Sequence, residues 1–134
     1  MKTILVDAVY CFIIEETGKF KIFQGMYELL EKYPNEKIIL TSANDDKREL
    51  YGLDIMPYEV FTLKHNPEKT DVKYYKTFLT KFNLNKEDVI YFEHSQDAVK
   101  SAQSVGIKTY YYDDNKKDLE SLKKFIDENL VEEI

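Results

Sequence analysis

The sequence contains one cysteine, no tryptophan and no long apolar run. Because Cys11 has no second thiol with which to pair, an intrachain disulfide is excluded, and we expect a protein of the reducing cytoplasm. No apolar run approaches the roughly 20 residues that a membrane-spanning helix needs, so we expect no membrane insertion. The first residues also make a poor signal peptide, because Asp7 interrupts their apolar run.

Basic residues are in deficit as well: 19 lysines and arginines stand against 25 aspartates and glutamates, a net charge of −6. General nucleic-acid binding needs a basic surface that displaces counterions, so we do not expect it. An acidic protein can still bind phosphate where a lysine, a helix N-terminus or a metal ion provides positive potential. A phosphorylated small molecule or protein is therefore compatible with this charge as a partner, and the sequence predicts no oligomeric state.

What the sequence does contain is typical of one globular domain. Its 134 residues are 43% hydrophobic and 33% charged, which is enough to bury a core, and they include no internal repeat or linker-like stretch. The 11 tyrosines and 8 phenylalanines fall mostly at the core spacings of strands and helices, so we expect them to pack. We predict a single domain over residues 1–134.

Short apolar runs alternate with helical patterns along the chain, which is typical of a parallel α/β sheet. Three of the runs are almost continuously apolar, as expected for strands covered by helices on both faces. The predicted fold is a three-layer α/β/α arrangement with a five-stranded parallel sheet. The predicted strands lie near 2–8, 37–42, 59–63, 88–93 and 107–112.

Apolar residues at helical spacing predict helices around 26–33, 45–51, 71–82, 95–105 and 119–130. We expect the short second helix to begin at the capping residue Asn44 and to end at Gly52. Asp113 and Asp114 would cap the last helix. The acidic tail, residues 131–134, is expected to be frayed.

Residues 10–24 show a different pattern. Apolar stretches at 10–14 and 20–23 flank a polar segment, 15–19, that contains a glycine. This pattern predicts a β-hairpin, which would follow the first strand directly and lie over its end.

Polar side chains recur where the predicted strands end and, in the case of Lys69, just before a predicted helix. In an open parallel sheet the carboxyl ends of the strands line one crevice, so groups far apart in sequence can meet there. Singly, such residues are common turn and cap residues, and it is their joint order that carries a functional prediction. Carboxylates, hydroxyls and an ammonium group together predict a site for phosphate and a divalent cation. The residues are Asp7, Thr41, Ser42, Lys69, Glu93 and His94.

The order of these features resembles the haloacid dehalogenase superfamily over residues 2–112. The shared order is a strand ending in Asp, a hairpin flap, a helix, a strand ending in Thr-Ser, a lysine before a helix, and a strand ending in an acidic pair. The best local matches are residues 38–43 and 88–108. In the second match, Glu93, His94 and Ser95 stand where the family has Asp-Asp-Ser.

The resemblance implies a role for each residue. Asp7 would be the nucleophile that attacks phosphorus to give an aspartyl-phosphate. Thr41, with Ser42 beside it, would hydrogen-bond the transferring phosphoryl group. Lys69 would neutralise charge on the nucleophile and the phosphate. Lys64, directly after the strand at 59–63, is the alternative lysine, and we favour Lys69 because the spacing of the helix after it matches the family.

The resemblance also implies magnesium, held by Asp7, Glu93 and the backbone carbonyl of Val9. Two departures weaken the implied activity. The family's phosphatases have a second Asp two residues after the nucleophile, which acts as general acid and base, and here that residue is Val9. Tyr10-Cys11 then replaces the family's Gly-Thr. Loss of a positioned general acid–base typically costs about 10²–10⁴-fold in rate.

His94 is a candidate replacement for the missing acid–base, because an imidazole titrates near neutral pH and this one would lie near the crevice. A histidine at a strand end can equally be structural or exposed. We expect Cys11 to be buried in the core and His65 to lie in a loop.

The intervals between these motifs are short. Between Asp7 and Thr41 there is room only for the hairpin and one helix, and between Thr41 and Lys69 for one short helix and a strand. Neither interval can hold a cap domain, so we expect an open crevice that suits a macromolecular partner or a cap from a second subunit. Dehalogenation is disfavoured, because a small haloacid needs an enclosed apolar pocket.

We therefore predict a capless protein of the haloacid dehalogenase type with a degenerate active site, impaired or non-catalytic, that retains a crevice for phosphate and Mg²⁺. The alternative is an active magnesium-dependent phosphohydrolase that uses Asp7 as its nucleophile. A third interpretation is an interaction module that uses a tyrosine-rich surface and has no site.

Overall fold

A computed structural model describes residues 1–131 of the chain. Five parallel strands form one sheet, as predicted, and each strand bound lies within one residue of the expected position. The strand order is β5-β4-β1-β6-β7. A separate two-stranded antiparallel sheet contains β2 and β3. The strands of the main sheet are β1 (Thr3–Asp7), β4 (Lys37–Thr41), β5 (Glu59–Thr62), β6 (Val89–Glu93) and β7 (Lys108–Tyr111).

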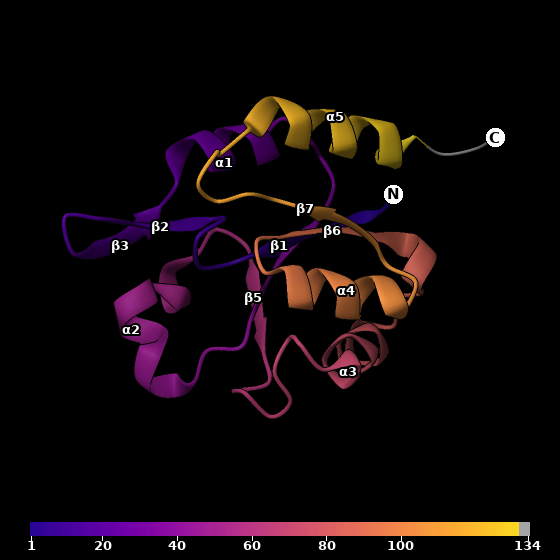
Figure 1. Cartoon of the computed structure of the whole chain (residues 1–134), viewed down its shortest axis with the longest axis horizontal. Helices are drawn as coiled ribbons and strands as arrows, with labels where there is room; N and C mark the ends of the chain where they lie inside the picture. The colour runs from indigo at the N-terminus through magenta and orange to yellow at the C-terminus, as the bar shows by residue number, and fades with distance from the viewer. Residues whose placement is uncertain (132–134) are drawn as a thin grey trace.

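Helices cover both faces of the main sheet, which confirms the three-layer prediction. Helices α1 (Gln24–Leu30) and α5 (Leu119–Leu130) lie on one face, and α3 (Val72–Phe82) and α4 (Gln96–Ser104) on the other (Figure 1). Successive side chains of a strand point to opposite faces. Accordingly Ile4 packs in the core under α1 and α5, whereas Leu5 packs in the core under α3 and α4.

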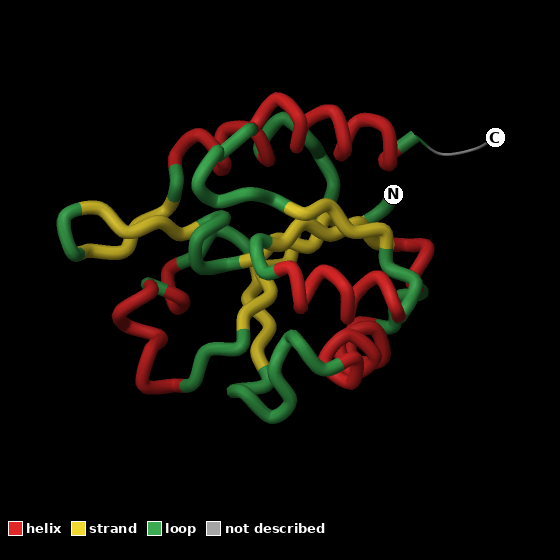
Figure 2. The backbone as a smooth tube through the Cα atoms, viewed as in Figure 1, coloured by secondary structure: helices red, strands yellow, loops and turns green. Residues whose placement is uncertain are grey.

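The predicted β-hairpin is present as β2 (Ile13–Glu16) and β3 (Lys19–Ile22), joined by two residues. Both of these, Thr17 and Gly18, have left-handed φ values, 50° and 78°, which matches the twist of a tight hairpin. The hairpin projects beyond the three layers (Figure 2). Its Phe20 ring lies edge-on to Tyr51 of helix α2 (Arg48–Tyr51), with the ring centroids 4.8 Å apart.

Two of the predicted helix caps are wrong. Residues Asp45–Lys47 form a 3₁₀ turn before α2, and the Asn44 side chain makes no capping hydrogen bond there. The cap of α5 is Asp118, whose carboxylate accepts the Ser121 N–H at 3.0 Å. Asp113, the predicted cap, instead accepts the Asn115 N–H at 2.9 Å, because a carboxylate readily closes a turn onto the backbone two residues ahead.

The ends of the elements differ from prediction in smaller ways. Helix α1 ends at Leu30, and Tyr33 lies past it, because the last turn tightens into hydrogen bonds between residues three apart. Gly52 ends α2 in the left-handed conformation, as predicted.

Residues 132–134 of the predicted frayed tail lie outside the described residues. Within residues 1–131, no helix has both the length and the apolarity to cross a bilayer.

Candidate functional site

The site lies where the three central strands end. Strands β4, β1 and β6 are neighbours, they run parallel, and each is completely buried, so Thr41, Asp7 and Glu93 arrive at one edge of the sheet. The side chains of Asp7 and Glu93 are 2% and 0% exposed. Two buried carboxylates need positive partners within the protein.

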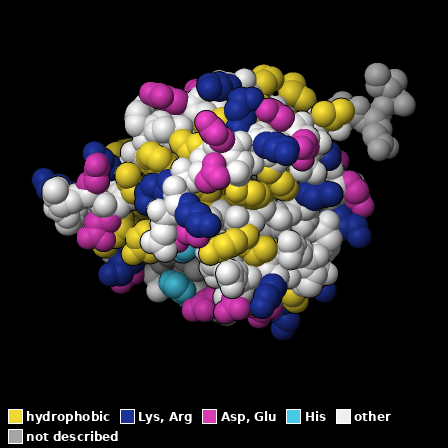
Figure 3. Space-filling view, turned by 45° about the horizontal axis from the view of Figure 1, so that its top comes forward, with side chains coloured by type: hydrophobic (Ala, Val, Ile, Leu, Met, Phe, Trp, Pro, Cys, Tyr) yellow, Lys and Arg dark blue, Asp and Glu magenta, His cyan; other side chains and the backbone are white. Residues whose placement is uncertain are grey.

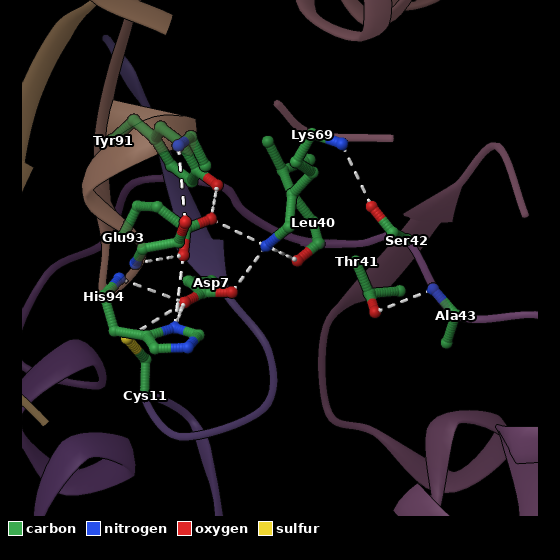
Figure 4. Close-up of polar contacts among 12 residues, drawn as sticks. Asp7, Cys11, Leu40, Thr41, Ser42, Ala43, Lys69, Tyr91, Glu93 and His94 are labelled. Carbon is green, nitrogen blue, oxygen red and sulfur yellow. Dashed lines mark hydrogen bonds and ion pairs between the residues drawn. The ribbon is translucent and has the colours of Figure 1, made fainter. Parts of the chain in front are cut away.

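Lys69 is one of these partners. Its backbone N–H donates to the Ser42 hydroxyl oxygen at 3.1 Å, which fixes the loop before α3 against the end of β4. From there its Nζ reaches Asp7 Oδ1 at 2.5 Å, Glu93 Oε1 at 2.7 Å and the Leu40 carbonyl at 3.3 Å (Figure 4). The alternative lysine, Lys64, lies elsewhere and pairs at the surface with Asp45.

His94 is the second partner. Its Nδ1 contacts Asp7 Oδ2 directly and lies 3.1 Å from Glu93 Oε2. Its backbone N–H also donates to Asp7 Oδ2, at 3.2 Å. The imidazole lies edge-on to the Tyr10 ring, with centroids 5.5 Å apart, and its side chain is 27% exposed. The histidine that the sequence offered as a replacement acid–base thus faces the two carboxylates.

Three further donors complete the surroundings of the carboxylate pair. The Cys11 thiol donates to Asp7 Oδ2 at 3.3 Å, the Tyr91 hydroxyl donates to Glu93 Oε1, and the Ser95 N–H donates to Glu93 Oε2 at 3.0 Å. Cys11 is fully buried, as predicted. Each of the four carboxylate oxygens therefore has at least one partner.

The charges of the four groups follow from these contacts. Burial and the neighbouring Glu93 raise the pKa of Asp7, against the opposing charge of Lys69. Burial disfavours a charged Glu93, but Lys69 and the hydrogen bond from His94 hold its pKa well below its usual range. Burial also opposes charge on His94, yet its hydrogen bonds to Asp7 and Glu93 raise its pKa to about 10. The pKa of Lys69 is held well above its usual range by both carboxylates, in spite of burial.

Two hydroxyls stand at the end of β4. Thr41 Oγ1 accepts the Ala43 N–H at 3.2 Å, and Ser42 Oγ accepts the Lys69 N–H. A hydroxyl has one proton to donate in addition to the bonds that it accepts. Both oxygens accept backbone N–H groups, so their own protons remain for an acceptor such as a phosphate oxygen.

A crevice of about 250 Å³ opens over these groups. Histidine side chains are visible at the surface in a hollowed part of this face (Figure 3). Sequence reasoning missed Lys47 and Tyr51, which lie in the 3₁₀ turn and in α2 after β4 and line the same crevice, and no sequence signal pointed to them. The lining residues are Asp7, Val9, Thr41, Ser42, Ala43, Lys47, Tyr51, His65, Lys69 and His94.

The arrangement is a poor match for the magnesium ion that the sequence resemblance implies. Magnesium binds oxygen ligands in near-ideal octahedral geometry and keeps several waters. Here an imidazole nitrogen contacts both Asp7 Oδ2 and Glu93 Oε2, and a thiol lies beside them. Asp7, Cys11 and His94 offer one oxygen, one sulfur and one nitrogen within 4.8 Å of one another, a mixed set that does not suit Mg²⁺.

No protein-family model and no curated protein matches this chain in sequence. Solved structures do match its fold. A protein from Listeria monocytogenes serotype 4b superposes with a TM-score of 0.65 at 16% identity, over 84% of this chain and 79% of that one. A mutant of a haloacid dehalogenase family enzyme from Bacteroides thetaiotaomicron, in complex with magnesium and inorganic phosphate, gives 0.60 at 12% identity, over 83% and 93%.

A third match is a haloacid dehalogenase-like protein of unknown function from Agrobacterium tumefaciens. It gives a TM-score of 0.58 at 15% identity, over 68% of this chain and 45% of that one. At such identities the likeness concerns the arrangement of helices and strands and not the chemistry of the site. The chain has the haloacid dehalogenase-like fold.

Proposed function

We propose that this protein binds the phosphoryl group of a phosphorylated small molecule or protein in the crevice, and that it hydrolyses the ligand slowly or not at all. The position of Lys69 carries the proposal. Its ammonium group lies between two buried carboxylates at the floor of the crevice, with the hydroxyls of Thr41 and Ser42 on the adjacent strand end. Ammonium and hydroxyl groups donate to phosphate oxygens, and a bound phosphate would take the Lys69 proton that reaches the Leu40 carbonyl at 3.3 Å, the longest of its three contacts.

The remaining lining residues favour an anion as well. Lys47 adds a second ammonium group at the crevice, and the imidazole of His94 borders it. Phosphate recognition needs this local positive potential even though the whole chain is acidic. The buried Cys11 thiol, the only one in the chain, is consistent with a reducing cytoplasmic setting.

Impaired hydrolysis follows from two features of the residues around Asp7. Its Oδ2 is occupied by His94 and Cys11, so only Oδ1, which Lys69 contacts, keeps a lone pair that could attack phosphorus. Val9, two residues along, lines the crevice with a hydrocarbon side chain that can neither protonate a leaving group nor activate water. A missing general acid–base alone lowers a rate by about 10²–10⁴-fold.

A second candidate is an active phosphohydrolase in which Asp7 is the nucleophile and His94 is the acid–base. One observation favours it: the partly exposed imidazole of His94 borders the crevice and already contacts Asp7. In this case His94 would donate a proton to the leaving group and would then take a proton from the water that attacks the aspartyl-phosphate.

Binding is tested by titrating inorganic phosphate into the wild type and into Lys69→Met, which keeps the length of the side chain and removes its charge. We expect the affinity to fall at least about tenfold in the variant, the size expected for losing a charged hydrogen bond. Lys64→Met is the matched control, since Lys64 pairs with Asp45 at the surface. Equal affinity in wild type and Lys69→Met, or no binding to the wild type, would contradict the proposal.

Turnover is tested by phosphate release from an aryl phosphate, with and without Mg²⁺, in the wild type and in Asp7→Asn. We expect little release from either protein. Rapid release by the wild type that disappears in Asp7→Asn would establish the second candidate in place of the first.

A further inference from the structure

We propose that the imidazole of His94 takes the place of a divalent cation in this site, so that the protein binds its ligand without a metal ion. The identity of the ligand rests on the proposed function, whereas the role of His94 rests on its own contacts. These contacts involve the buried carboxylates of Asp7 and Glu93, the two side chains that would otherwise hold a cation.

The two carboxylates are joined twice, once by each basic side chain. Lys69 Nζ contacts Asp7 Oδ1 and Glu93 Oε1, at 2.5 and 2.7 Å. His94 Nδ1 contacts the other oxygen of each carboxylate, Asp7 Oδ2 and Glu93 Oε2. A cation shared by the carboxylates on the side away from Lys69 would lie where this nitrogen lies.

The surrounding backbone holds the imidazole there. The His94 N–H donates to Asp7 Oδ2, and the next residue, Ser95, donates its N–H to Glu93 Oε2. Ser95 is also the N-cap of α4, so the turn between β6 and α4 is fixed at both ends. The Tyr10 ring lies against the imidazole from the side of the hairpin.

A metal ion that entered this position would have to displace the imidazole from both carboxylates. It would also lie close to the ammonium group of Lys69, which already contacts the same pair, and like charges in a buried site repel strongly. Displacing the ring breaks its two charge-assisted contacts with the carboxylates. The metal ion that replaces it must also lose part of its hydration shell. Lys69 and His94 thus neutralise the carboxylates of Asp7 and Glu93 and occupy their oxygens without a metal ion.

The test measures the melting temperature of the full chain with MgCl₂ alone, with ZnCl₂ alone, and with inorganic phosphate in the presence of either Mg²⁺ or a chelator. Ligands that bind the folded state raise the melting temperature. We expect no shift with either metal and the same phosphate-dependent shift in both backgrounds. A rise with Mg²⁺ alone, or loss of the phosphate shift in chelator, would overturn the inference. A rise with Zn²⁺ alone would overturn it too, because Asp7, Cys11 and His94 would then act as metal ligands.

Substitution of His94 provides a second test. His94→Asp removes the imidazole and supplies the acidic residue that the sequence resemblance places here, so we expect Mg²⁺ to raise the melting temperature of this variant. His65→Asp is the matched control: His65 also lines the crevice but contacts Glu68, and its variant should not respond to Mg²⁺. A folded His94→Asp variant without a Mg²⁺ response would count against the inference. If this variant does not fold, the wild-type measurements decide.

Failure of the proposed function gives a different result from failure of the inference. If phosphate shifts the wild type in neither background, the protein does not bind phosphate. The two metal-only measurements and the His94→Asp response to Mg²⁺ would still test whether the histidine replaces a metal ion.

Discussion

Lys69 and His94 contact the same two carboxylates through different oxygens, one residue on each side of the pair. Asp7 and Glu93 come from neighbouring strands, β1 and β6, so the two basic side chains also connect those strands beyond their last backbone hydrogen bonds. Breaking a buried ion pair by removing one partner typically costs about 3–5 kcal/mol. The site is therefore part of what stabilises the carboxyl edge of the sheet.

Val9→Asp should raise the rate of phosphate release from an aryl phosphate by up to about 10²-fold, because it restores an acid two residues after Asp7. Val9 lines the crevice, so the new carboxylate can reach a bound leaving group. Val9→Asn has nearly the same shape and no acid, and should remain at the wild-type rate. Equal rates in the two variants would show that the missing acid is not what limits turnover.

The stabilisation supplied by His94 should decline at high pH. Folding raises its pKa from 6.5 to about 10, chiefly through hydrogen bonds to Asp7 and Glu93 that outweigh burial. A group with a raised folded pKa stabilises fully below its unfolded pKa, and the contribution is lost as the pH rises through the folded value. The melting-temperature difference between wild type and His94→Asn should thus be largest near pH 6.5 and below, and should vanish above about pH 10.

Other side chains titrate in this range in both proteins, so the difference between wild type and variant is the quantity to follow. If the difference in melting temperature between wild type and His94→Asn stays constant between these pH values, a protonated His94 does not stabilise the carboxylate pair.

Cys11 should resist thiol reagents in the native protein. Burial raises the pKa of its thiol well above the usual range, and the negative charges of Asp7 and Glu93 raise it further. The thiolate is the reactive form, and this one is both disfavoured and inaccessible. The rate of Cys11 alkylation by iodoacetamide should therefore rise with urea concentration in proportion to the fraction of unfolded protein. Rapid alkylation without urea would show that the segment between β1 and β2 opens readily.

Two buried tyrosines should respond oppositely to removal of the hydroxyl. Tyr112 is 1% exposed, and its hydroxyl has no hydrogen-bond partner among residues 1–131, whereas the Tyr91 hydroxyl donates to Glu93. Tyr112→Phe should leave the free energy of unfolding unchanged or raise it by about 1 kcal/mol, and Tyr91→Phe should lower it by about 1–3 kcal/mol. Urea denaturation measures both. A larger loss in Tyr112→Phe than in Tyr91→Phe would contradict these bonding assignments.

Much of the fold could be predicted because its central strands are apolar along their whole length. Residues 37–42 and 88–93 have no polar alternation, so they had to be covered on both faces, and that requirement specifies a parallel sheet between helices. The polar residues that follow such strands then share one edge, which is why Asp7, Thr41 and Glu93 could be placed together from sequence.

The contacts within the site could not be predicted in the same way. That His94 faces both carboxylates depends on the turn between β6 and α4 and on the rotamer of one side chain, neither of which has a periodic signal. Tyr51 lines the crevice from α2, which packs beside the hairpin through the contact of Tyr51 with Phe20. The prediction of Asn44 as the cap was wrong because a 3₁₀ turn takes up the residues before α2.

The strand order has a consequence for how the protein is made. Strand β1 lies at the centre of the sheet, but its neighbours β4 and β6 follow it only after long stretches of chain. During synthesis Asp7 leaves the ribosome long before Lys69, and Lys69 before Glu93 and His94. The carboxylate pair and both of its basic partners can therefore come together only after most of the chain has been translated. Until then, β1 can pair with β4 on one side only, and its other edge stays exposed on the nascent protein until β6 is made.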